Sequence, residues 1–346
     1  MILEDIDLND AYSLDCAVWE FTLACNLRCQ HCGSSAGKAR PDELSTEEAF
    51  RLCEMLAAVR CKEVCLMGGE PLLRDDFLSV AKCIKQLGMR LSVVTNGTLL
   101  EEHARTLSLA DPEVVGISLD GMEETHEKIR GADTWKTTIE GMERLRDMDQ
   151  QVTVITAVSK INYRDLPQMR ELLKGKNVNW QIQTAMPFGN FQREHTLDAE
   201  EFYATALFIA KERIREKSQR MRIVGAHCYG YHSKVLPGCS WDGCTAGRST
   251  VGITSDGGVV GCLSMGNDRH IEGNVRERSF KDIWEDPRAF SYTRGFNVDD
   301  LGENCRRCRY GAKCGGGCSS VSLSLTGRLH NDPYCFYSIE RSRKNR

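Results

Sequence analysis

Hydrophobic and polar positions along the first two thirds of the chain follow two alternating periods. Six short runs of apolar and β-branched residues predict buried strands, and a segment with apolar positions three or four residues apart follows each run, which predicts a helix. Ser45 and Glu48 form a capping-box pattern where the first helix begins. The predicted strands are 16–22, 63–67, 91–95, 114–119, 152–158 and 180–184. The predicted helices follow Ser45, run from Asp75 or Asp76 through Leu87, and cover 101–108, 136–147, 165–173 and 198–217.

Strands that alternate with helices in this way predict a parallel α/β sheet with right-handed crossovers. Six such units indicate an incomplete barrel or an open doubly wound sheet. Gly, Asn or Asp residues follow the strands at their carboxyl ends, where parallel sheets build their sites. Near residue 226 the periodicity gives way to glycines, cysteines and short strands. The chain therefore divides into an N-terminal segment, 1–15, an α/β core, 16–225, and a cysteine-rich domain, 226–346.

Cysteine is the unusual residue in an otherwise ordinary composition. The chain has 17 cysteines, seven between Cys25 and Cys83 and nine between Cys228 and Cys335. The N-terminus lacks a signal peptide, so we expect a cytoplasmic protein whose thiols bind metal rather than form disulfides. No apolar run approaches the ~20 residues of a membrane span. The net charge is −4, so nothing predicts a membrane or nucleic-acid partner.

The first cysteine cluster directly follows the first predicted strand. Cys25, Cys29 and Cys32 have the spacing C-x3-C-x2-C. Three thiolates on one loop can bind three irons of a [4Fe–4S] cluster and leave the fourth iron open to another ligand. Structural zinc usually takes four closed ligands. Buried cysteines without metal are the remaining alternative, and three within eight residues make it the weaker one.

This loop and the strand ends behind it resemble the radical SAM superfamily. Gly68-Gly69-Glu70-Pro71 matches the GGEP motif, Thr95-Asn96-Gly97 follows the next strand, and Ser118-Leu119-Asp120-Gly121 with His126 and Arg130-Gly131 is similar to the SLDG…H…RG stretch of SPASM-containing members. The resemblance implies that the GGEP backbone and glutamate contact the amino group of SAM, and that Ser118 and Arg130 help hold its carboxylate and ribose. The cofactor-binding residues that it implies are Gly68, Gly69, Glu70, Pro71, Thr95, Asn96, Ser118, Asp120 and Arg130.

The resemblance also implies a fold and a chemistry. The fold is a partial (β/α)6 TIM-like barrel, in agreement with the six units counted above, followed by a small SPASM domain. In the family, SAM chelates the open iron, an electron from the cluster cleaves a carbon–sulfur bond, and a 5′-deoxyadenosyl radical abstracts hydrogen from the substrate. The cofactors supply the reactive species, and the protein orients them and keeps water away.

A second set of cysteines resembles the SPASM pattern. Cys244, Gly257 and Cys262 match C-x9–15-G-x4-C, and a C-x2-C-x5-C-x3-C run with a final cysteine follows. A zinc ribbon is the alternative. The resemblance implies two auxiliary [4Fe–4S] clusters and so three clusters in all. The implied ligands are Cys239, Cys244, Cys262 and Cys318 for the first auxiliary cluster, and Cys305, Cys308, Cys314 and Cys335 for the second. Cys239 lies outside the seven-cysteine motif, and without it the first auxiliary cluster has an open site.

One further cysteine is a candidate catalytic residue. Cys228 lies in the loop GAHCYGYH near the predicted domain boundary. It either donates a hydrogen atom to a substrate radical or is a packed spectator thiol. The neighbouring rings either contact substrate or pack locally; they belong to His227, Tyr229, Tyr231 and His232. Helix 198–217 and the loop 186–189 are candidate walls of the substrate cavity.

The implied function is that of a radical SAM/SPASM oxidoreductase that modifies a peptide. The leading expectation is maturation of a ribosomally made peptide by crosslinking, epimerisation or another oxidation. Formylglycine formation in sulfatases and small-molecule dehydrogenation are alternatives, and a non-catalytic iron–sulfur carrier is the alternative from another class. The implied partners are a peptide or protein substrate and an electron donor such as flavodoxin or ferredoxin. Either a separate protein binds the leader of the substrate, or the barrel mouth alone recognises the substrate. Asp242 and Asp256 are available acids, although surface or turn roles suit them better.

Overall fold

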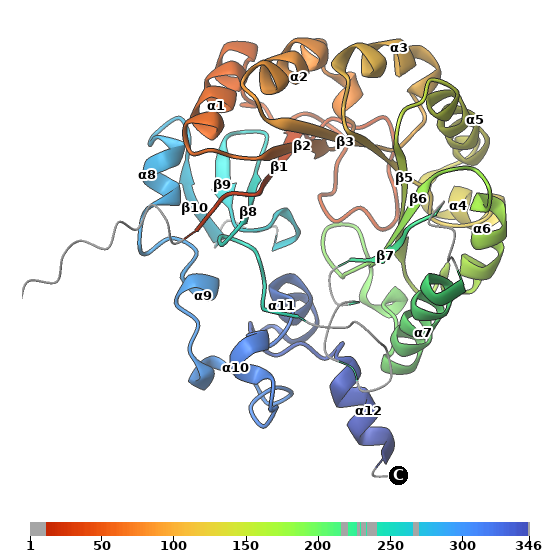
Figure 1. Ribbon diagram of the computed structural model, residues 1–346, viewed down its shortest axis with the longest axis vertical. Helices are drawn as coiled ribbons and strands as arrows, with labels where there is room; N and C mark the ends of the chain where they lie inside the picture. The colour runs from red at the N-terminus through yellow and green to blue at the C-terminus, as the bar shows by residue number, and fades with distance from the viewer. Residues whose placement is uncertain are drawn as a thin grey trace, which may run out of the picture.

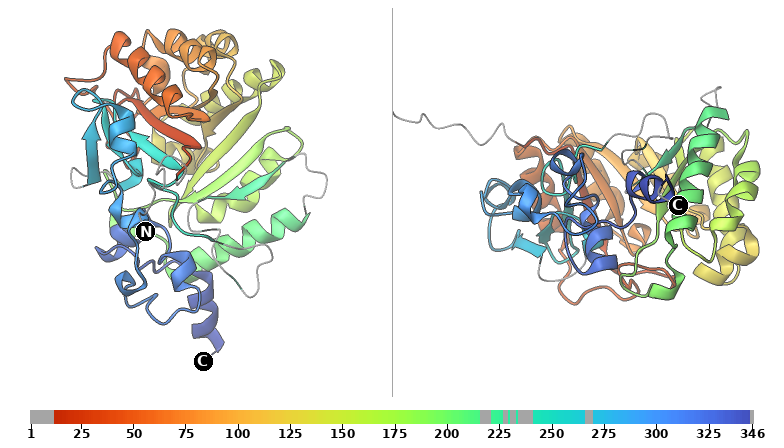
Figure 2. Two further views of the ribbon diagram at one scale, coloured as in Figure 1. Left: turned by 60° about the vertical axis from the view of Figure 1, so that its left-hand side comes forward. Right: turned by 90° about the horizontal axis from the view of Figure 1, so that it is seen from below.

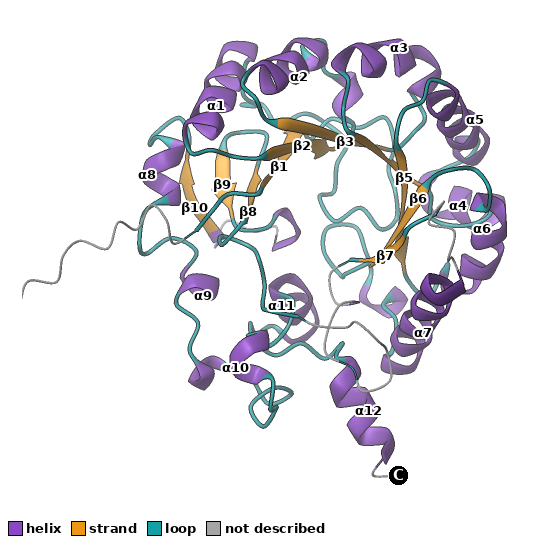
Figure 3. Ribbon diagram, viewed as in Figure 1, coloured by secondary structure: helices purple, strands orange, loops and turns teal. Residues whose placement is uncertain are grey.

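The computed structural model describes residues 12–215, 221–226, 229, 233, 241–265 and 270–344. Its centre is one ten-stranded sheet with the order β10-β9-β8-β1-β2-β3-β4-β5-β6-β7. The sheet curves into an open barrel, and helices α1 to α7 cover its outer side (Figure 1, Figure 3). The strands are β1 Cys16–Thr22, β2 Glu63–Gly68, β3 Arg90–Thr95, β4 Val114–Ser118, β5 Val152–Val158, β6 Asn179–Thr184, β7 Ile223–Gly225, β8 Thr250–Ile253, β9 Gly258–Val260 and β10 Ile271–Asn274.

Among the described residues, seven α-helices belong to the barrel and five to the C-terminal region. The first group is α1 Thr46–Ala58, α2 Phe77–Gln86, α3 Leu100–Ala110, α4 Glu123–Arg130, α5 Thr134–Asp147, α6 Leu166–Leu173 and α7 Ala199–Arg215. The second group is α8 Phe280–Trp284, α9 Ser291–Arg294, α10 Gly311–Cys314, α11 Ser319–Thr326 and α12 Phe336–Lys344. Among the described residues, no helix is both long and apolar enough to cross a membrane.

The strand and helix predictions for the barrel are confirmed to within one or two residues. The capping box of α1 is present, since Ser45 accepts from the backbone of Glu48 and the Glu48 side chain accepts from the backbone of Ser45. Asp76 holds the N-cap position of α2 without a capping hydrogen bond. Its carboxylate instead accepts hydrogen bonds from Arg74 and Thr46, which take the place of the backbone N–H groups of the helix.

Helix α4 is absent from the predicted elements. Its sequence, EETHEKIR, is mostly charged, and the only side chains that it buries are those of His126 and Ile129. Two apolar-facing positions in eight residues are too few for a periodicity argument to detect. The helix nevertheless matters, because it carries Arg130 to the cavity described below.

The cysteine-rich region extends the barrel sheet. β8 pairs in parallel with β1, with Cys16 opposite Thr250 and Trp19 opposite Ile253, and β9 and β10 continue the sheet antiparallel. β7 pairs with β6 at the other edge. The α/β sheet therefore recruits strands from both sides of residue 226, which short-range periodicity could not indicate.

The last part of the chain lies at one end of the barrel and packs against α7 (Figure 2). The rings of Tyr334 and Phe336 stack on Phe202 at centroid distances of 4.6 and 5.3 Å. The hydroxyl of Tyr203 donates to Glu340 in α12 at 3.1 Å. These aromatic contacts join the C-terminal region to the hydrophobic core of the barrel.

Candidate active site and metal centres

The three cysteines of the first cluster line one cavity at the carboxyl ends of the parallel strands. Cys25, Cys29 and Cys32 lie on the loop after β1, and the cavity volume is about 280 Å³. Each sulfur has a donor near it. The backbone N–H of Leu27 lies 3.4 Å from Cys25 Sγ, the backbone N–H of Ala36 lies 3.3 Å from Cys32 Sγ, and Arg130 Nη1 lies 3.9 Å from Cys29 Sγ.

Donors aimed at sulfur stabilise negatively charged, metal-bound thiolates. Without metal, burial raises the pKa of Cys25, and it raises the pKa of Cys29 to about 11. Bound iron supplies the positive charge that lets such buried thiols lose their protons. The loop therefore fits an iron–sulfur cluster in both its geometry and its chemistry.

Close backbone packing fixes the shape of this loop. A Cβ on Gly69 would overlap the carbonyl of Ala24, and a Cβ on Gly189 would overlap the carbonyl of Cys32. Gly189 also has a φ of +57°, which favours glycine. Asn190 donates from its backbone to the Cys32 carbonyl at 2.9 Å. The loop 186–189 thus supports the cysteines, and its Met186 and Phe188 line the cavity.

Most residues of the strand-end motifs line the same cavity. They come from the ends of β2, β3 and β4 and from α4. The lining residues among them are Gly68, Gly69, Thr95, Asn96, Ser118 and Arg130. The structure thus brings six of the nine predicted cofactor-binding residues together with the three cysteines. Glu70, Pro71 and Asp120 are buried and do not line the cavity.

Glu70 joins the GGEP motif to the Thr95-Asn96-Gly97 motif and does not itself line the cavity. Its carboxylate accepts from the Thr95 hydroxyl at 2.9 Å and from the backbone N–H of Asn96 at 2.8 Å. Burial raises the pKa of Glu70 to about 7, and these hydrogen bonds oppose that rise. Glu70 therefore orients the Thr95-Asn96 turn, which itself faces the cavity.

Asp120 is the centre of a buried charge network. One of its oxygens accepts from Arg130 Nε at 2.5 Å and lies 2.7 Å from His31 Nε2, and the other accepts from the backbone of Ala157. Burial acts to raise the pKa of Asp120, but the charge of Arg130 and the contact with His31 hold it well below its usual range. The network therefore fixes the side chains of Arg130 and His31, both of which line the cavity.

His31 and His126 extend this network. Sequence reasoning placed His126 in the SLDG…H…RG stretch without a role and did not single out His31. His31 lies between Cys29 and Cys32, lines the cavity, and has a side chain that is only 7% exposed. Its place inside the cysteine motif was the available signal. His126 is fully buried, accepts from the backbone N–H of Asp120, and has a pKa lowered to about 4 by burial and the nearby Arg130 charge.

The far wall of the cavity has a different character. It is formed by the end of β6, the loop 186–189 and parts of the cysteine-rich region. The lining residues there are Gln183, Thr184, Ala185, Met186, Phe188, Leu263, Ser264, Ser320 and Val321. Among the described residues, α7 contributes none of this wall, contrary to the expectation for helix 198–217. Its buried Phe202 instead stacks on Tyr229 at 5.0 Å, which gives Tyr229 a packing role.

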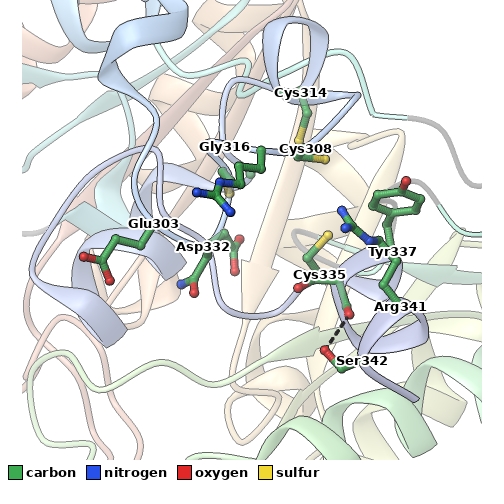
Figure 4. Close-up of a pocket in the computed structure, with 15 residues that line it drawn as sticks. Glu303, Cys308, Cys314, Gly316, Asp332, Cys335, Tyr337, Arg341 and Ser342 are labelled. Atoms are coloured by element: carbon green, nitrogen blue, oxygen red, sulfur yellow. Dashed lines mark hydrogen bonds between the residues drawn. The ribbon is translucent and has the colours of Figure 1, made fainter. Parts of the chain in front are cut away.

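A second cavity lies in the C-terminal region and has a volume of about 250 Å³. Four thiols line it, from Cys305, Cys308, Cys314 and Cys335, and Figure 4 shows three of them around one space. Burial raises the pKa of Cys305 and of Cys335 to about 12. Four thiols around one cavity match the ligand set implied for the second auxiliary cluster.

Three of the four remaining predicted ligands, Cys244, Cys262 and Cys318, form a third group. Burial, and after it the charge of Cys244, raise the pKa of both Cys262 and Cys318, so these two thiols lie near Cys244. The backbone N–H of Cys318 donates to Asp332, which also lines the second cavity, so the two groups adjoin. Cys239, Cys228, His227, Tyr231 and His232 lie outside the described residues.

The two available acids, Asp242 and Asp256, line neither cavity in the described part of the chain. No group of three or more His, Cys, Asp or Glu side chains there is arranged around a single metal ion. Asp242 pairs with Lys313 at the surface, and Asp256 accepts from Thr254 in the turn between β8 and β9. Both acids therefore have the surface and turn roles that suited them from the sequence.

Comparison with known proteins agrees with this architecture. Residues 19–173 match the family model of the radical SAM superfamily, and residues 244–309 match that of the SPASM iron–sulfur cluster-binding domain. An AdoMet-dependent heme synthase of Methanosarcina barkeri is 29% identical, with 92% of this chain and 95% of that protein covered. Mycofactocin maturase MftC of Mycobacterium ulcerans is 28% identical, with 92% and 87% covered.

A solved structure shares the fold. Streptococcus suis SuiB bound to precursor peptide SuiA has a TM-score of 0.75 and 15% identity, with 94% of this chain and 77% of that chain covered. By these family-model matches the chain carries a radical SAM domain at 19–173 and a SPASM domain at 244–309. It is an enzyme that uses SAM and iron–sulfur clusters, and its relatives include maturases and heme synthases.

Proposed function

We propose that this enzyme holds three [4Fe–4S] clusters and modifies a peptide substrate. Cys25, Cys29 and Cys32 hold the SAM-binding cluster. Cys239, Cys244, Cys262 and Cys318 hold the first auxiliary cluster, and Cys305, Cys308, Cys314 and Cys335 hold the second. The domains of this proposal are 16–225 for the radical SAM core and 226–346 for the auxiliary region, after an N-terminal segment of 15 residues.

In this proposal the strand-end residues bind SAM beside the first cluster. The backbone of Gly68 and Gly69 and the side chains of Asn96 and Ser118 offer polar groups toward the cavity. Arg130 presents a positive charge that Asp120 holds in place. When bound, SAM and the cluster supply a 5′-deoxyadenosyl radical that removes a hydrogen atom from the substrate. The enclosing wall keeps water and other hydrogen donors out.

The far wall of the cavity is uncharged, and this observation favours a peptide substrate. Its described polar groups are an amide and hydroxyls, from Gln183, Thr184, Ser264 and Ser320, beside apolar Met186 and Phe188. Such groups pair with the N–H and C=O of a peptide backbone. The described cation of this cavity, Arg130, is paired with Asp120 at the opposite end. The precursor peptide in the SuiB structure and the maturase relative support the same choice.

The test uses the reconstituted full-length enzyme with SAM and dithionite under anaerobic conditions. We expect 5′-deoxyadenosine, and an iron content of about twelve per chain from three four-iron clusters. With a candidate precursor peptide encoded near the gene, mass spectrometry should show a mass change in the peptide. Deuterium at the attacked carbon should appear in 5′-deoxyadenosine. No 5′-deoxyadenosine from enzyme with intact clusters would contradict the proposal.

A heme precursor is the second candidate substrate, because the heme synthase of Methanosarcina barkeri is 29% identical across 92% of this chain. Tetrapyrrole precursors of heme carry several carboxylates, and a site for them needs cations that are free to pair. The same assay with an iron tetrapyrrole in place of the peptide separates the two. A chemically changed tetrapyrrole with an unchanged peptide would replace the peptide assignment.

The proposal also includes the partners and the compartment. An external electron donor of the flavodoxin or ferredoxin class reduces the clusters, and a separate protein binds the leader of the substrate. The enzyme works in the cytoplasm, where thiols stay reduced until they bind iron. Cys228 keeps its place in the proposal as the candidate hydrogen donor to the substrate radical.

A further inference from the structure

The rim of the second cysteine cavity is strongly basic in an otherwise acidic chain. From Glu303, the first residue that lines the cavity, to the C-terminus, the sequence has nine Lys and Arg and three Asp and Glu, a formal charge of +6. The whole chain has a charge of −4. Positive charge is therefore concentrated in the part of the sequence that carries one of the candidate metal centres.

Four arginines of this region are exposed and form no ion pair with a carboxylate of the described chain. They are Arg306, Arg307, Arg309 and Arg341. Arg307 and Arg341 line the cavity itself, and Figure 4 shows Arg341 beside Tyr337. Arg130 at the first cavity differs, because it is paired with Asp120 and its side chain is only 10% exposed. Exposed, unpaired charges of one sign create a field that attracts an oppositely charged partner.

The four thiols that line this cavity are the proposed ligands of the second auxiliary cluster. A redox partner attracted to the arginines would therefore lie near that cluster. We propose that the arginine rim is the docking surface for an acidic one-electron redox protein, which reduces the cluster held by Cys305, Cys308, Cys314 and Cys335. One electron passes from the reduced partner to an oxidised [4Fe–4S] cluster, and no bond forms or breaks. This inference rests on the proposed function, because it needs the second auxiliary cluster.

The test measures how fast a reduced acidic flavodoxin reduces the reconstituted full-length enzyme, by stopped-flow absorbance. The variant Arg306→Glu/Arg309→Glu changes two rim residues that do not line the cavity. Lys82→Glu/Arg105→Glu is the matched control on the exposed faces of α2 and α3. We expect the rim variant to lose about tenfold in the second-order rate constant at low ionic strength, with a difference that shrinks as salt rises.

Dithionite-driven formation of 5′-deoxyadenosine should be equal in the three proteins, and its loss in unmodified enzyme would count against the proposed function alone. Equal losses in the rim variant and its control would overturn the docking surface. In the unmodified enzyme, a rate constant that does not fall with salt would also overturn it. The docking surface would also be overturned if duplex DNA bound tightly at the rim and did not slow reduction of the enzyme by flavodoxin.

A separate observation concerns the third group of cysteines. The phenol oxygen of Tyr292, on α9, is buried and has no hydrogen-bond partner. It lies so close to Gly261, the residue before Cys262, that a Cβ there would overlap it. Burial and the charges of Cys244 and Cys262 raise the pKa of Tyr292, so the phenol is near these thiols. An unpaired buried hydroxyl is unfavourable, and a bound acceptor would relieve this cost.

We infer that Tyr292 donates a hydrogen bond to a sulfur of the first auxiliary cluster and raises its reduction potential. Hydrogen bonds to cluster sulfurs are among the features that set this potential, because they stabilise the more negative, reduced state. Tyr292 is thus a positioning and tuning residue, and it does not contact the reacting atoms. The inference depends on the proposed cluster there but not on the substrate.

Tyr292→Phe removes only the hydroxyl, and Tyr163→Phe is the control on the barrel. An EPR-monitored redox titration should show a lower potential for one auxiliary cluster in Tyr292→Phe, by about 59 mV if the reduction equilibrium changes tenfold. Its iron content should equal that of the unmodified enzyme. In the unmodified enzyme, ENDOR of the reduced cluster should detect an exchangeable proton. An unchanged potential, no such proton, or a loss of about four irons, which would make the phenol a ligand, would overturn the inference.

Discussion

The two ends of the chain build their cysteine sites in different ways. Cys25, Cys29 and Cys32 lie on one loop, within eight residues, at the edge of a completed parallel sheet. The second cavity is lined by Cys335, just before α12, and by three cysteines in and around α10, a helix of only four residues. The first site is placed by the barrel, whereas the second holds together a region with little regular structure of its own.

Buried charge shows the same contrast. Behind the first site, Asp120 and Glu70 are fully buried and make hydrogen bonds that fix the cavity wall. Around the second site the charges are mostly exposed arginines. A preorganised site keeps its shape without its ligand, while a region of short helices depends on bound metal for its stability. The following four predictions test this comparison, from the largest expected effect to the smallest.

Loss of the first cysteines should abolish the reaction and spare the fold. In Cys25→Ala/Cys29→Ala/Cys32→Ala, formation of 5′-deoxyadenosine should fall to background, a loss of at least about a thousandfold. About eight irons per chain should remain in the two auxiliary clusters. Cys53→Ala, in the buried face of α1, is the control and should keep about twelve. Residual SAM cleavage in the triple variant would contradict the assignment.

Removal of iron should unfold one region and leave the other. Structural metal sites contribute on the order of 10 kcal/mol to the folding of small domains. After anaerobic chelation, limited proteolysis with mass spectrometry should show new cleavage within 303–344, while the fragment 16–184 resists. The barrel has its own apolar core, which includes Trp19, Leu66 and Ile182. Equal loss of protection in both regions would show that the barrel also depends on its cluster.

His126 should make the barrel site sensitive to acid. Its pKa in the folded protein is about 4, below the 6.5 of an unfolded histidine, so the unfolded state binds a proton first as pH falls. The stability contribution is complete above pH 6.5 and is lost as pH falls to about 4, a change of about 3 kcal/mol.

Chemical denaturation of the holoenzyme at several pH values measures this effect. His126→Gln should remove that part of the pH dependence, and His103→Gln, on α3, should leave it in place. An unchanged slope of stability against pH in His126→Gln would show that the buried imidazole contributes nothing to it.

The smallest effect concerns the loop that supports the first cysteines. Gly189 and Gly175 both have positive φ values, +57° and +76°, but a Cβ meets the Cys32 carbonyl at the first and nothing within 4 Å at the second. Gly189→Ala should therefore cost about 2 kcal/mol more than Gly175→Ala in the free energy of unfolding. It should also lower the iron content of the first cluster. Equal costs would mean that the loop moves away freely.

Much of the barrel follows from local patterns. The strands at 16–22 and 152–158 agree with β1 and β5 residue for residue, and the capping box at Ser45 is formed as expected. In these segments each residue's neighbours along the chain are enough to indicate its conformation, since apolar alternation matches the burial of the strand. The polar helix α4 escaped such reasoning, because its only apolar inward side chain is Ile129.

For the candidate site, too, the sequence predicted one part and packing between distant segments decided the other. The positions of the cysteines and of the strand-end motifs could be predicted, because parallel strands bring their carboxyl ends to one edge. Which motif residues face the cavity and which lie behind it could not be. Asp120 and Glu70 turn away to bind Arg130 and the Thr95-Asn96 turn, and His31 turns in. These directions result from packing between α4, β3 and the cysteine loop.

Spacing along the chain thus establishes the family, the parallel barrel and the cysteines available to iron, because motifs and periodicity are properties of neighbouring residues. Contacts between distant segments establish the rest. They pair β8 with β1, bring Ser320 and Val321 to the wall of the first cavity, and direct the phenol of Tyr292 toward Cys262. Such contacts depend on the surface that each element buries against another, and the one-dimensional order of residues does not record that surface.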